Sequence, residues 1–189
     1  MPQQVATLVI VRKATCRLYN LFKALTSKNP IVLLQAYKTY VRPLLEYGTT
    51  VFNPHKSTQK KMIEKVQNSF TRKLMIRIGG FDYNTIPNGH YRDIKFNLET
   101  LTARRRKNDL LMVWKILNQS IGLNAESFFV LAHSRTRGGS AKLRLKKARY
   151  SIRFNYFANR AGSDFLKLSK KYFTGVSLHS FKTTVDRYL

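Results

Sequence analysis

Apolar residues recur every three or four positions along most of the chain, which is the spacing of one face of an α-helix. In residues 17–25, for example, Leu18, Leu21, Phe22 and Leu25 lie on one such face. Later segments repeat this spacing, with polar residues on the opposite side. Helices are expected over residues 17–25, 30–45, 57–78, 98–117 and 178–189. The pattern therefore predicts a mainly α-helical fold: a helical bundle, then a basic, partly extended arm and a short C-terminal helix.

Turn-forming residues predict where these helices begin and end. Asn29 is a good N-cap, and Pro30 suits the first turn of the helix that follows it. Pro43 falls inside that helix and predicts a kink or an early end, because proline has no N–H to donate. Gly79 predicts the end of the long third helix. Residues 82–95 are rich in turn-forming residues and are expected to form a loop.

The charge pattern changes after Val130. Residues 133–153 carry eight Lys or Arg residues, no acid and a Gly-Gly-Ser step, so a mobile or extended basic arm is expected. Residues 143–150 could form a short strand or hairpin within this arm. Phe154 and Phe157 begin an apolar segment, and both are assigned to the core.

This change of charge suggests two regions. Residues 1–130 are expected to form the helical region, and residues 131–189 the basic arm and the C-terminal region. Either Ser177 or Ser180 is expected to cap the C-terminal helix, since serine oxygen accepts hydrogen bonds from the first backbone N–H groups.

Net charge narrows the choice of partners. The chain of 189 residues has 43% hydrophobic residues, enough for a packed core. Its 35 Lys and Arg residues face only 9 Asp and Glu residues, which leaves a net charge of +26. Such a surplus repels itself unless a polyanion neutralises it. Nucleic acid is the first candidate for that polyanion, and an anionic membrane is the second.

The membrane alternative has little support in the sequence. The apolar run over residues 8–11 is far too short to span a bilayer, and the basic residues Arg12 and Lys13 follow it, whereas a signal peptide has them in front. We therefore expect no membrane partner and an intracellular protein of the nucleus or cytoplasm. The lone Cys16 fits a reducing compartment and is expected to be buried in a helix. The oligomeric state is left open.

Residues suited to catalysis are scattered. No two acids are adjacent, so no pair resembles the carboxylate cluster with which polymerases hold two metal ions. The histidines, at 55, 90, 133 and 179, have no second ligand at metal-binding spacing, and His55 and His90 are expected in loops or caps. There is no phosphate-binding glycine loop and no nucleophile-elbow motif. The sequence therefore predicts no catalytic residue, no metal, no cofactor and no enzymatic activity.

Three basic segments are the candidates for nucleic-acid contact. Arg and Lys neutralise phosphates, so binding should weaken steeply with salt and read little sequence. Alanine at Arg104, Arg105 and Arg106 is then expected to weaken binding about equally for all sequences. Tyr150 and Tyr156 lie beside the arm and could stack on unpaired bases. The candidates are Lys60, Lys61, Lys65, Arg72, Lys73, Arg104, Arg105, Arg106, Lys107, Arg135, Arg137, Lys142, Arg144, Lys146, Lys147, Arg149 and Arg153.

Several segments, taken in order, resemble one known family. They are RLYNLFKAL (17–25), AYKTYVRPLLEYGTTVFNP (36–54), IEKVQNSFTRKL (63–74), NLETLTARRRKNDLLMVWKILN (97–118), RTRGGSAKLRLKKAR (135–149), FNYFANRAG (154–162) and SLHSFKTTVDRYL (177–189). Together they resemble the region after the palm in reverse transcriptases of non-LTR retrotransposons, of the LINE, jockey and CR1 type. The catalytic aspartate motif of the palm in that family does not occur in this sequence.

The resemblance implies a thumb-like helical element that grips a template–primer duplex, without the polymerase activity of the parent enzyme. An RNA–DNA or other duplex is the expected partner, and single strands are an open possibility. Two alternatives remain: a relic reading frame with no selected role, and a basic structural or interaction protein of a ribonucleoprotein. An active polymerase would need a palm from another chain and ranks last.

Overall fold

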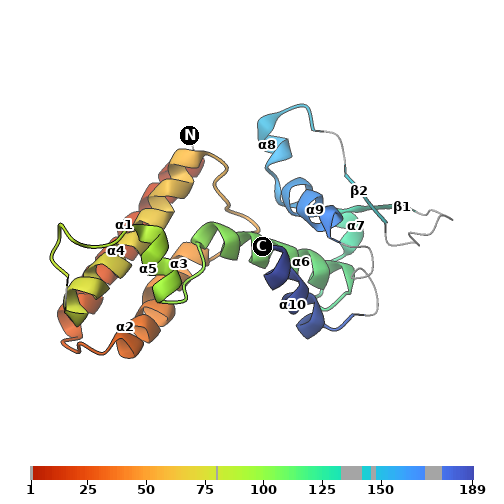
Figure 1. Cartoon of the computed structure of the whole chain (residues 1–189). Coiled ribbons are helices and arrows are strands. Elements are labelled where there is room, and N and C mark those ends of the chain that lie inside the picture. Colours follow the sequence, from red (N-terminus) through yellow and green to blue (C-terminus); the bar gives the residue numbers. More distant parts are fainter. Residues whose placement is uncertain (1, 80, 133–141, 146–147, 169–175) are drawn as a thin grey trace. The chain divides into compact units, whose positions relative to one another are not determined.

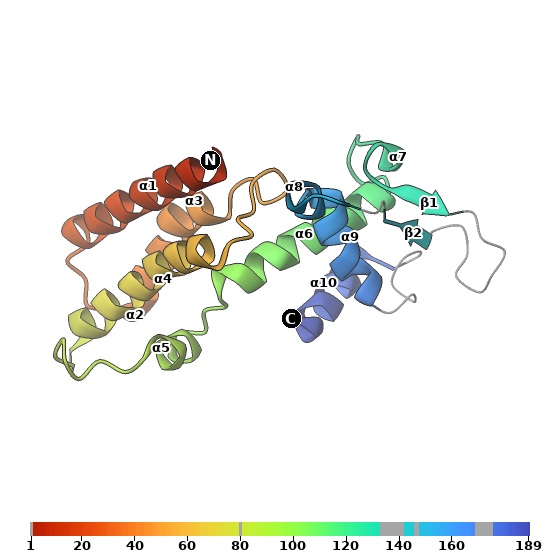
Figure 2. The same cartoon turned by 90° about the horizontal axis from the view of Figure 1, so that it is seen from above.

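A computed structural model describes residues 2–79, 81–132, 142–145, 148–168 and 176–189 (Figures 1 and 2). The fold is mainly helical, as predicted. It divides into two compact units, which we call unit 1 (Met1–Gly48 and Phe52–Arg104) and unit 2 (Thr49–Val51 and Arg105–Leu189). The division therefore falls inside helix α6 (Leu101–Leu117), and differs from the boundary at residue 130 that the change of charge suggested. Packing explains the difference, because the second half of α6 buries its apolar residues in the core of unit 2.

Unit 1 is built around two long helices that lie side by side, α1 (Pro2–Ala24) and α4 (Ser57–Ile78) (Figures 1 and 2). Helix α4 has the predicted bounds, although its N-cap residue is Lys56, whose side chain accepts no hydrogen bond from the first turn. Gly79 ends it with φ of 91°, as predicted. Helix α1 begins earlier than the predicted residue 17, because nothing after Pro2 interrupts the helix.

The core of unit 1 joins these two helices to the shorter elements between them. Tyr37 stacks on Phe70 with ring centroids 4.1 Å apart, which fixes the middle of α4. The buried apolar residues of the unit 1 core are Ala14, Leu18, Leu21, Phe22, Leu33, Ala36, Tyr37, Val41, Leu45, Ile63, Val66, Phe70, Leu74, Met75, Phe96, Leu98 and Leu101. Cys16 is exposed, and its predicted burial is wrong. It lies two residues from both Ala14 and Leu18, so it points away from the face that packs.

The segment around Pro43 stays helical. Helix α2 (Pro30–Ala36) begins as predicted, with the side-chain oxygen of Asn29 accepting a bond from the Ile31 N–H. It runs into a π-helical segment, η1 (Tyr37–Val41), and then α3 (Arg42–Glu46). The Arg42 N–H bonds to the Tyr37 carbonyl, five residues earlier. This one-residue widening lies just before Pro43, which has no N–H to donate, and the chain continues as a helix where the sequence predicted a kink or an early end.

Helix α5 (Gly89–Lys95) lies in the stretch 82–95 that the sequence predicts as a loop, so that prediction is wrong for its second half. The turn residue Asn88 acts as an N-cap, since its side-chain oxygen accepts from the Tyr91 N–H at 2.9 Å. Arg92 is 1% exposed and donates to the Thr71 hydroxyl at 3.1 Å. Burial, and next the charge of Arg72, lower the pKa of Arg92. A buried arginine was not predicted, and it holds α5 against α4.

Unit 2 packs helices α6, α9 (Phe157–Lys167) and α10 (Leu178–Tyr188) around one core. Ser177 caps α10, accepting from the Ser180 N–H, as one of the two alternatives predicted. The core of this unit consists of Leu110, Val113, Trp114, Ile116, Phe129, Leu143, Phe157, Ala158, Ala161, Phe165, Leu168, Phe181 and Val185. Phe157 is in the core as predicted, whereas Phe154 is 62% exposed and was wrongly assigned to it. Phe154 ends the short helix α8 (Ser151–Phe154), on a turn of its own before α9.

A short strand pair completes unit 2. Strand β1 (Val130–Ala132), which follows α7 (Ala125–Phe128), pairs antiparallel with β2 (Lys142–Arg144), with Leu131 opposite Leu143. Residue 143 is therefore in a strand, as predicted, while Tyr150 is not. The mobile character predicted for the arm over 133–141 and 146–147 lies outside the described residues.

Candidate nucleic-acid interface

Helix α4 places a row of basic side chains on its outer face. Lys61, Lys65 and Arg72 lie at i, i+4 and i+11, with Asn68 between them at i+7. At 1.5 Å per residue, this row extends for about 16 Å along the helix. The buried residues of α4, such as Phe70, lie on the opposite side of the helix. We call Lys61, Lys65 and Arg72 the α4 stripe.

The α4 stripe has few partners inside the protein. Within the described part of the chain, Lys61 and Lys65 make no side-chain hydrogen bond or ion pair, and both are exposed. Two like charges at i and i+4 destabilise a helix by about 0.2–0.5 kcal/mol, so the pair does not serve the helix itself. Arg72 is held in place: it donates to the Tyr83 hydroxyl at 2.9 Å, and its guanidinium lies 5.1 Å from that ring's centroid.

The other two α4 candidates lie off this stripe. Lys60 is exposed beside it. The Lys73 ammonium instead lies over the rings of Tyr19 and Phe22 on α1, 5.6 and 5.8 Å from their centroids. The structure therefore brings Lys61, Lys65 and Arg72 together and directs Lys73 to the α1 side.

A groove of about 720 Å³ lies beside the α4 stripe. It is lined by Lys61, Glu64, Lys65, Asn68, Gly89, His90, Asp93, Thr100 and Thr102. His90 is in α5, not in the loop that the sequence predicted, and sequence reasoning did not place it near the lysines. Its position follows from the cap at Asn88, which starts α5 next to α4.

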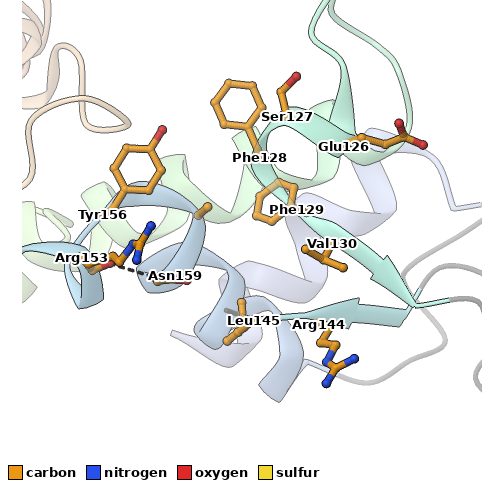
Figure 3. A pocket seen from close by; sticks show the side chains of 11 residues that line it. Glu126, Ser127, Phe128, Phe129, Val130, Arg144, Leu145, Arg153, Tyr156 and Asn159 are labelled. Carbon is orange, nitrogen blue, oxygen red and sulfur yellow. Dashed lines mark hydrogen bonds between the residues drawn. The ribbon is translucent and has the colours of Figure 1, made fainter. Parts of the chain in front are cut away.

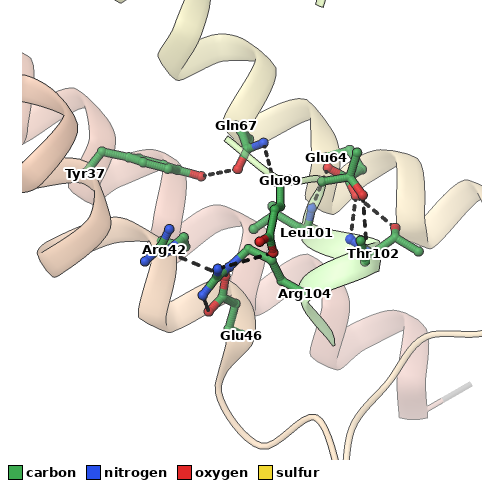
Figure 4. A network of polar contacts seen from close by, with 11 residues as sticks. Tyr37, Arg42, Glu46, Glu64, Gln67, Glu99, Leu101, Thr102 and Arg104 are labelled. Atoms are coloured by element: carbon green, nitrogen blue, oxygen red, sulfur yellow. Dashed lines mark hydrogen bonds and ion pairs between the residues drawn. The ribbon is translucent and has the colours of Figure 1, made fainter. Parts of the chain in front are cut away.

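The two acids in this groove, Glu64 and Asp93, both accept hydrogen bonds from other parts of unit 1. Glu64 accepts bonds from the backbone N–H groups of Leu101 and Thr102, at 3.2 and 2.8 Å, and so caps the N-terminus of α6 (Figure 4). Asp93 accepts from the Gln67 amide at 3.5 Å. Burial raises the pKa of Asp93, which the bond from Gln67 opposes. Among the described residues that line this groove, Lys61 and Lys65 are therefore the charged side chains without a partner.

A buried polar network fixes α4 in position. The Tyr37 hydroxyl donates to the Gln67 side-chain oxygen at 3.2 Å, and the Gln67 amide donates to the Glu99 carbonyl at 3.1 Å (Figure 4). Burial raises the pKa of Tyr37, so this hydroxyl stays a donor. These bonds link α4 to η1 and to the segment just before α6, and they hold the stripe on a rigid support.

The basic run at the start of α6 has a different environment. Arg104 forms a two-pronged pair with Glu46 and lies 3.5 Å from Glu99 (Figure 4). The Glu46 carboxylate raises the pKa of Arg104. Arg105 is only 3% exposed. Within unit 1, Arg104 therefore serves the fold by joining α3 to α6.

The rest of this run is paired within unit 2. Arg106 contacts Asp164 at 3.0 Å, and Lys107 contacts Asp186. Two residues further on, Asp109 pairs with Arg160 at 2.9 Å. Consecutive side chains on a helix point in different directions around its axis. In this run, Arg104, Arg106 and Lys107 each reach an acid on another helix, and Arg105 is buried.

The basic arm is described only in part. Arg135, Arg137, Lys146 and Lys147 lie outside the described residues, and Lys142 is known only as the partner of Ala132 in the strand pair. Arg144, Arg149 and Arg153 are exposed. Arg144 and Arg153 line one pocket together with Tyr156 and Asn159 (Figure 3).

The other candidate chemistry does not converge. Among the described residues, no three His, Cys, Asp or Glu side chains are close enough to hold a metal ion. His55 lies in the connection before α4, as predicted. The acids Glu46, Asp109, Asp164 and Asp186 form ion pairs with basic residues. Across the described ranges, no helix has the length and apolar character needed to cross a bilayer.

Comparisons of the chain with protein-family models, curated proteins and solved structures find no match. The resemblance to the thumb region of non-LTR reverse transcriptases therefore remains a prediction from the sequence.

Proposed function

We propose that this chain binds nucleic acid through its phosphates, with the α4 stripe as the principal contact in unit 1, and that it has no catalytic activity. The observation behind the proposal is the position of Lys61 and Lys65. They are exposed on a well-supported helix and have no partner among the described residues. Glu64 and Asp93, the two acids in the groove beside the stripe, accept hydrogen bonds from other groups, so a polyanion is the natural counterpart of this surface.

The geometry suits backbone contact. Lysine offers a mobile point charge, and Arg72, held by Tyr83, offers a planar fork that can grip a phosphate. Each neutralised phosphate adds about 0.9 to the salt dependence, so three stripe contacts would add about 2.7 to the slope of log K against log salt. The side chains of the stripe carry no arrangement typical of base reading, so we expect affinity for backbone and shape and little for sequence.

The sequence resemblance supports the same class of partner. A thumb-like region of a retrotransposon reverse transcriptase would hold a template–primer duplex and leave nucleotide addition to a palm. We therefore propose an RNA–DNA duplex as the preferred ligand, and a non-catalytic part of such a polymerase as the origin of the chain. An intracellular location, nuclear or cytoplasmic, follows from that proposal.

The proposal is tested by binding to an RNA–DNA duplex, double-stranded DNA and single-stranded RNA across a salt series. We expect salt-sensitive binding that is tightest for the RNA–DNA duplex. Weak binding of the folded protein to all three ligands at low salt would overturn the proposal. A primed template with Mg²⁺ or Mn²⁺ should give no nucleotide incorporation, and incorporation by a pure preparation would contradict the non-catalytic part.

A further inference from the structure

Unit 2 contains a small pocket where α7 and β1 meet the turn between α8 and α9 (Figure 3). Its volume is about 170 Å³. Pockets for drug-sized ligands usually measure about 300–1,000 Å³, so this one suits a single small ring system. The pocket is lined by Glu126, Ser127, Phe128, Phe129, Val130, Arg144, Leu145, Arg153, Tyr156, Ala158 and Asn159.

An aromatic cluster makes one wall of this pocket rigid. The ring centroids of Phe128, Phe129 and Phe157 are 6.3 to 6.4 Å apart in all three pairs. Phe129 and Phe157 are buried in the core, and Phe128 reaches from it to the pocket (Figure 3). A flat ligand would therefore meet a preformed apolar surface.

The rim of the pocket combines an exposed ring with unpaired cations. Tyr156 is 57% exposed, although it lies next to the aromatic cluster. The guanidinium groups of Arg144 and Arg153 are exposed and have no partner in the described ranges. Exposed aromatic rings beside arginines are the combination that binds unpaired nucleotides, because the ring stacks on a base and the arginine grips a phosphate.

Polar groups inside the pocket could orient such a base. The Asn159 side-chain N–H donates to the Arg153 carbonyl at 2.7 Å, which leaves its oxygen to accept a bond from a ligand. Glu126 lies at the far end of the pocket from Arg153 (Figure 3). Its negative charge would repel a phosphate and accept from a base amino group. The phosphate end of a nucleotide is therefore favoured near Arg153.

We infer that this pocket of unit 2 takes one unpaired nucleotide of the bound nucleic acid, with the base against Tyr156 and Phe128 and the phosphate on Arg153. The inference rests on the proposed function. An adjacent pocket of about 390 Å³ shares Phe128 and Tyr156, but its other lining residues are uncharged. Phosphate contact therefore selects the side of Tyr156 that carries Arg153.

The test compares a blunt RNA–DNA duplex with the same duplex carrying a short single-stranded tail. Wild-type protein should bind the tailed duplex more tightly. Tyr156→Ala should lose about ten-fold affinity for the tailed duplex, since base stacking is worth about 1–3 kcal/mol. It should bind the blunt duplex as wild type does. Tyr156→Phe keeps the ring and should retain the affinity, and Phe154→Ala, which removes an exposed ring outside the pocket, is the matched control.

The outcomes separate the inference from the proposed function. If wild type binds neither duplex, the proposed function fails. If it binds both equally, or if Tyr156→Ala and Phe154→Ala behave alike, the pocket has no role and the inference is overturned. Should Tyr156→Ala fold poorly, Arg153→Gln replaces it, because Arg153 is exposed and makes only backbone bonds. That variant should lose affinity for the tailed duplex alone, and unchanged binding would overturn the inference.

Discussion

The α4 stripe and the basic run of α6 carry similar charge but differ in their partners. Arg104, Arg106 and Lys107 of the run each face an acid, and Arg105 is buried. The lysines of the stripe form no ion pair in the described part of the chain. A dense cluster of cations in the sequence is therefore a poor guide to a binding surface, and the informative property is which cations the fold leaves unused.

The distribution of acids explains this difference. With only 9 acids against 35 basic residues, the fold cannot neutralise every cation. Several acids form ion pairs with α6. Glu46 of α3 pairs with Arg104 at the start of this helix, and the pairs Arg106–Asp164 and Asp109–Arg160 join its later part to α9. Part of the charge that remains lies on α4, where Lys61 and Lys65 are exposed and accessible to a polyanion.

The largest effect that would sharpen the comparison is expected at Asp109. Its side chain is 4% exposed and pairs with Arg160, which also donates to the carbonyls of Asn155 and Thr49 at 2.9 Å. Asp109→Asn leaves the arginine without its counter-charge, and removing one partner of a buried pair costs about 3–5 kcal/mol. Urea unfolding measures this loss. An unchanged free energy of unfolding would contradict the structural role given to the α6 run and its neighbours.

A smaller loss of stability is expected at Arg104. Arg104→Gln removes the contacts with Glu46 and Glu99, which are partly exposed, so the cost should lie between that of a surface pair and a buried one, about 2 kcal/mol. The affinity of the folded variant for an RNA–DNA duplex should change little. A large loss of affinity with no loss of stability would show that Arg104 contacts the nucleic acid, and would contradict the structural role given to it here.

The same comparison changes how the triple alanine variant is interpreted. The sequence predicts that alanine at Arg104, Arg105 and Arg106 weakens binding uniformly. In the structure these side chains are paired or buried, so the variant should lose stability first. Circular dichroism before any binding assay separates the two effects.

The smallest effect is expected at Asp93. Burial raises its pKa above the usual 3.8, so at neutral pH its charge costs stability, and that cost disappears once the pH falls below about 3.8. Asp93→Asn keeps an acceptor for Gln67 and removes the charge. The variant should be slightly more stable than wild type at pH 7, and the difference should vanish in acid. Thermal melts of both proteins across a pH series measure this difference in stability. A variant that is less stable than wild type at pH 7 would contradict the claim that the charge of Asp93 costs stability.

Local signals in the sequence were sufficient for α4 and for the start of α2. The bounds of α4, the cap at Asn29 and the end at Gly79 depend on residues that act within one turn, so their types predict them. Helix α5 was missed because the same residue, Asn88, suits a loop or a helix cap, and only the burial of Arg92 decides between them.

Local signals could not predict the division into two units, nor the ion pairs that the basic run of α6 forms. Glu46 lies 58 residues from Arg104, and Asp164 lies 58 residues from Arg106. Such pairs depend on tertiary packing, which no spacing in the sequence reveals. The stripe could be predicted from the sequence, since the spacing of Lys61, Lys65 and Arg72 puts them on one helix face. The pocket at Tyr156 could not, because it depends on the path of the chain through the turn between α8 and α9.

The central claim is tested most directly by the salt dependence of RNA–DNA binding in two matched variants. One replaces Lys61, Lys65 and Arg72 by Gln, and the other replaces the exposed Arg12, Lys13 and Lys28 of unit 1, so both lose three positive charges. The stripe variant should stay folded, bind more weakly, and show a slope of log K against log salt that is lower by about 2.7. The control should keep nearly the wild-type slope. Equal losses in both variants would show that only net charge matters and would contradict the α4 stripe as the binding surface.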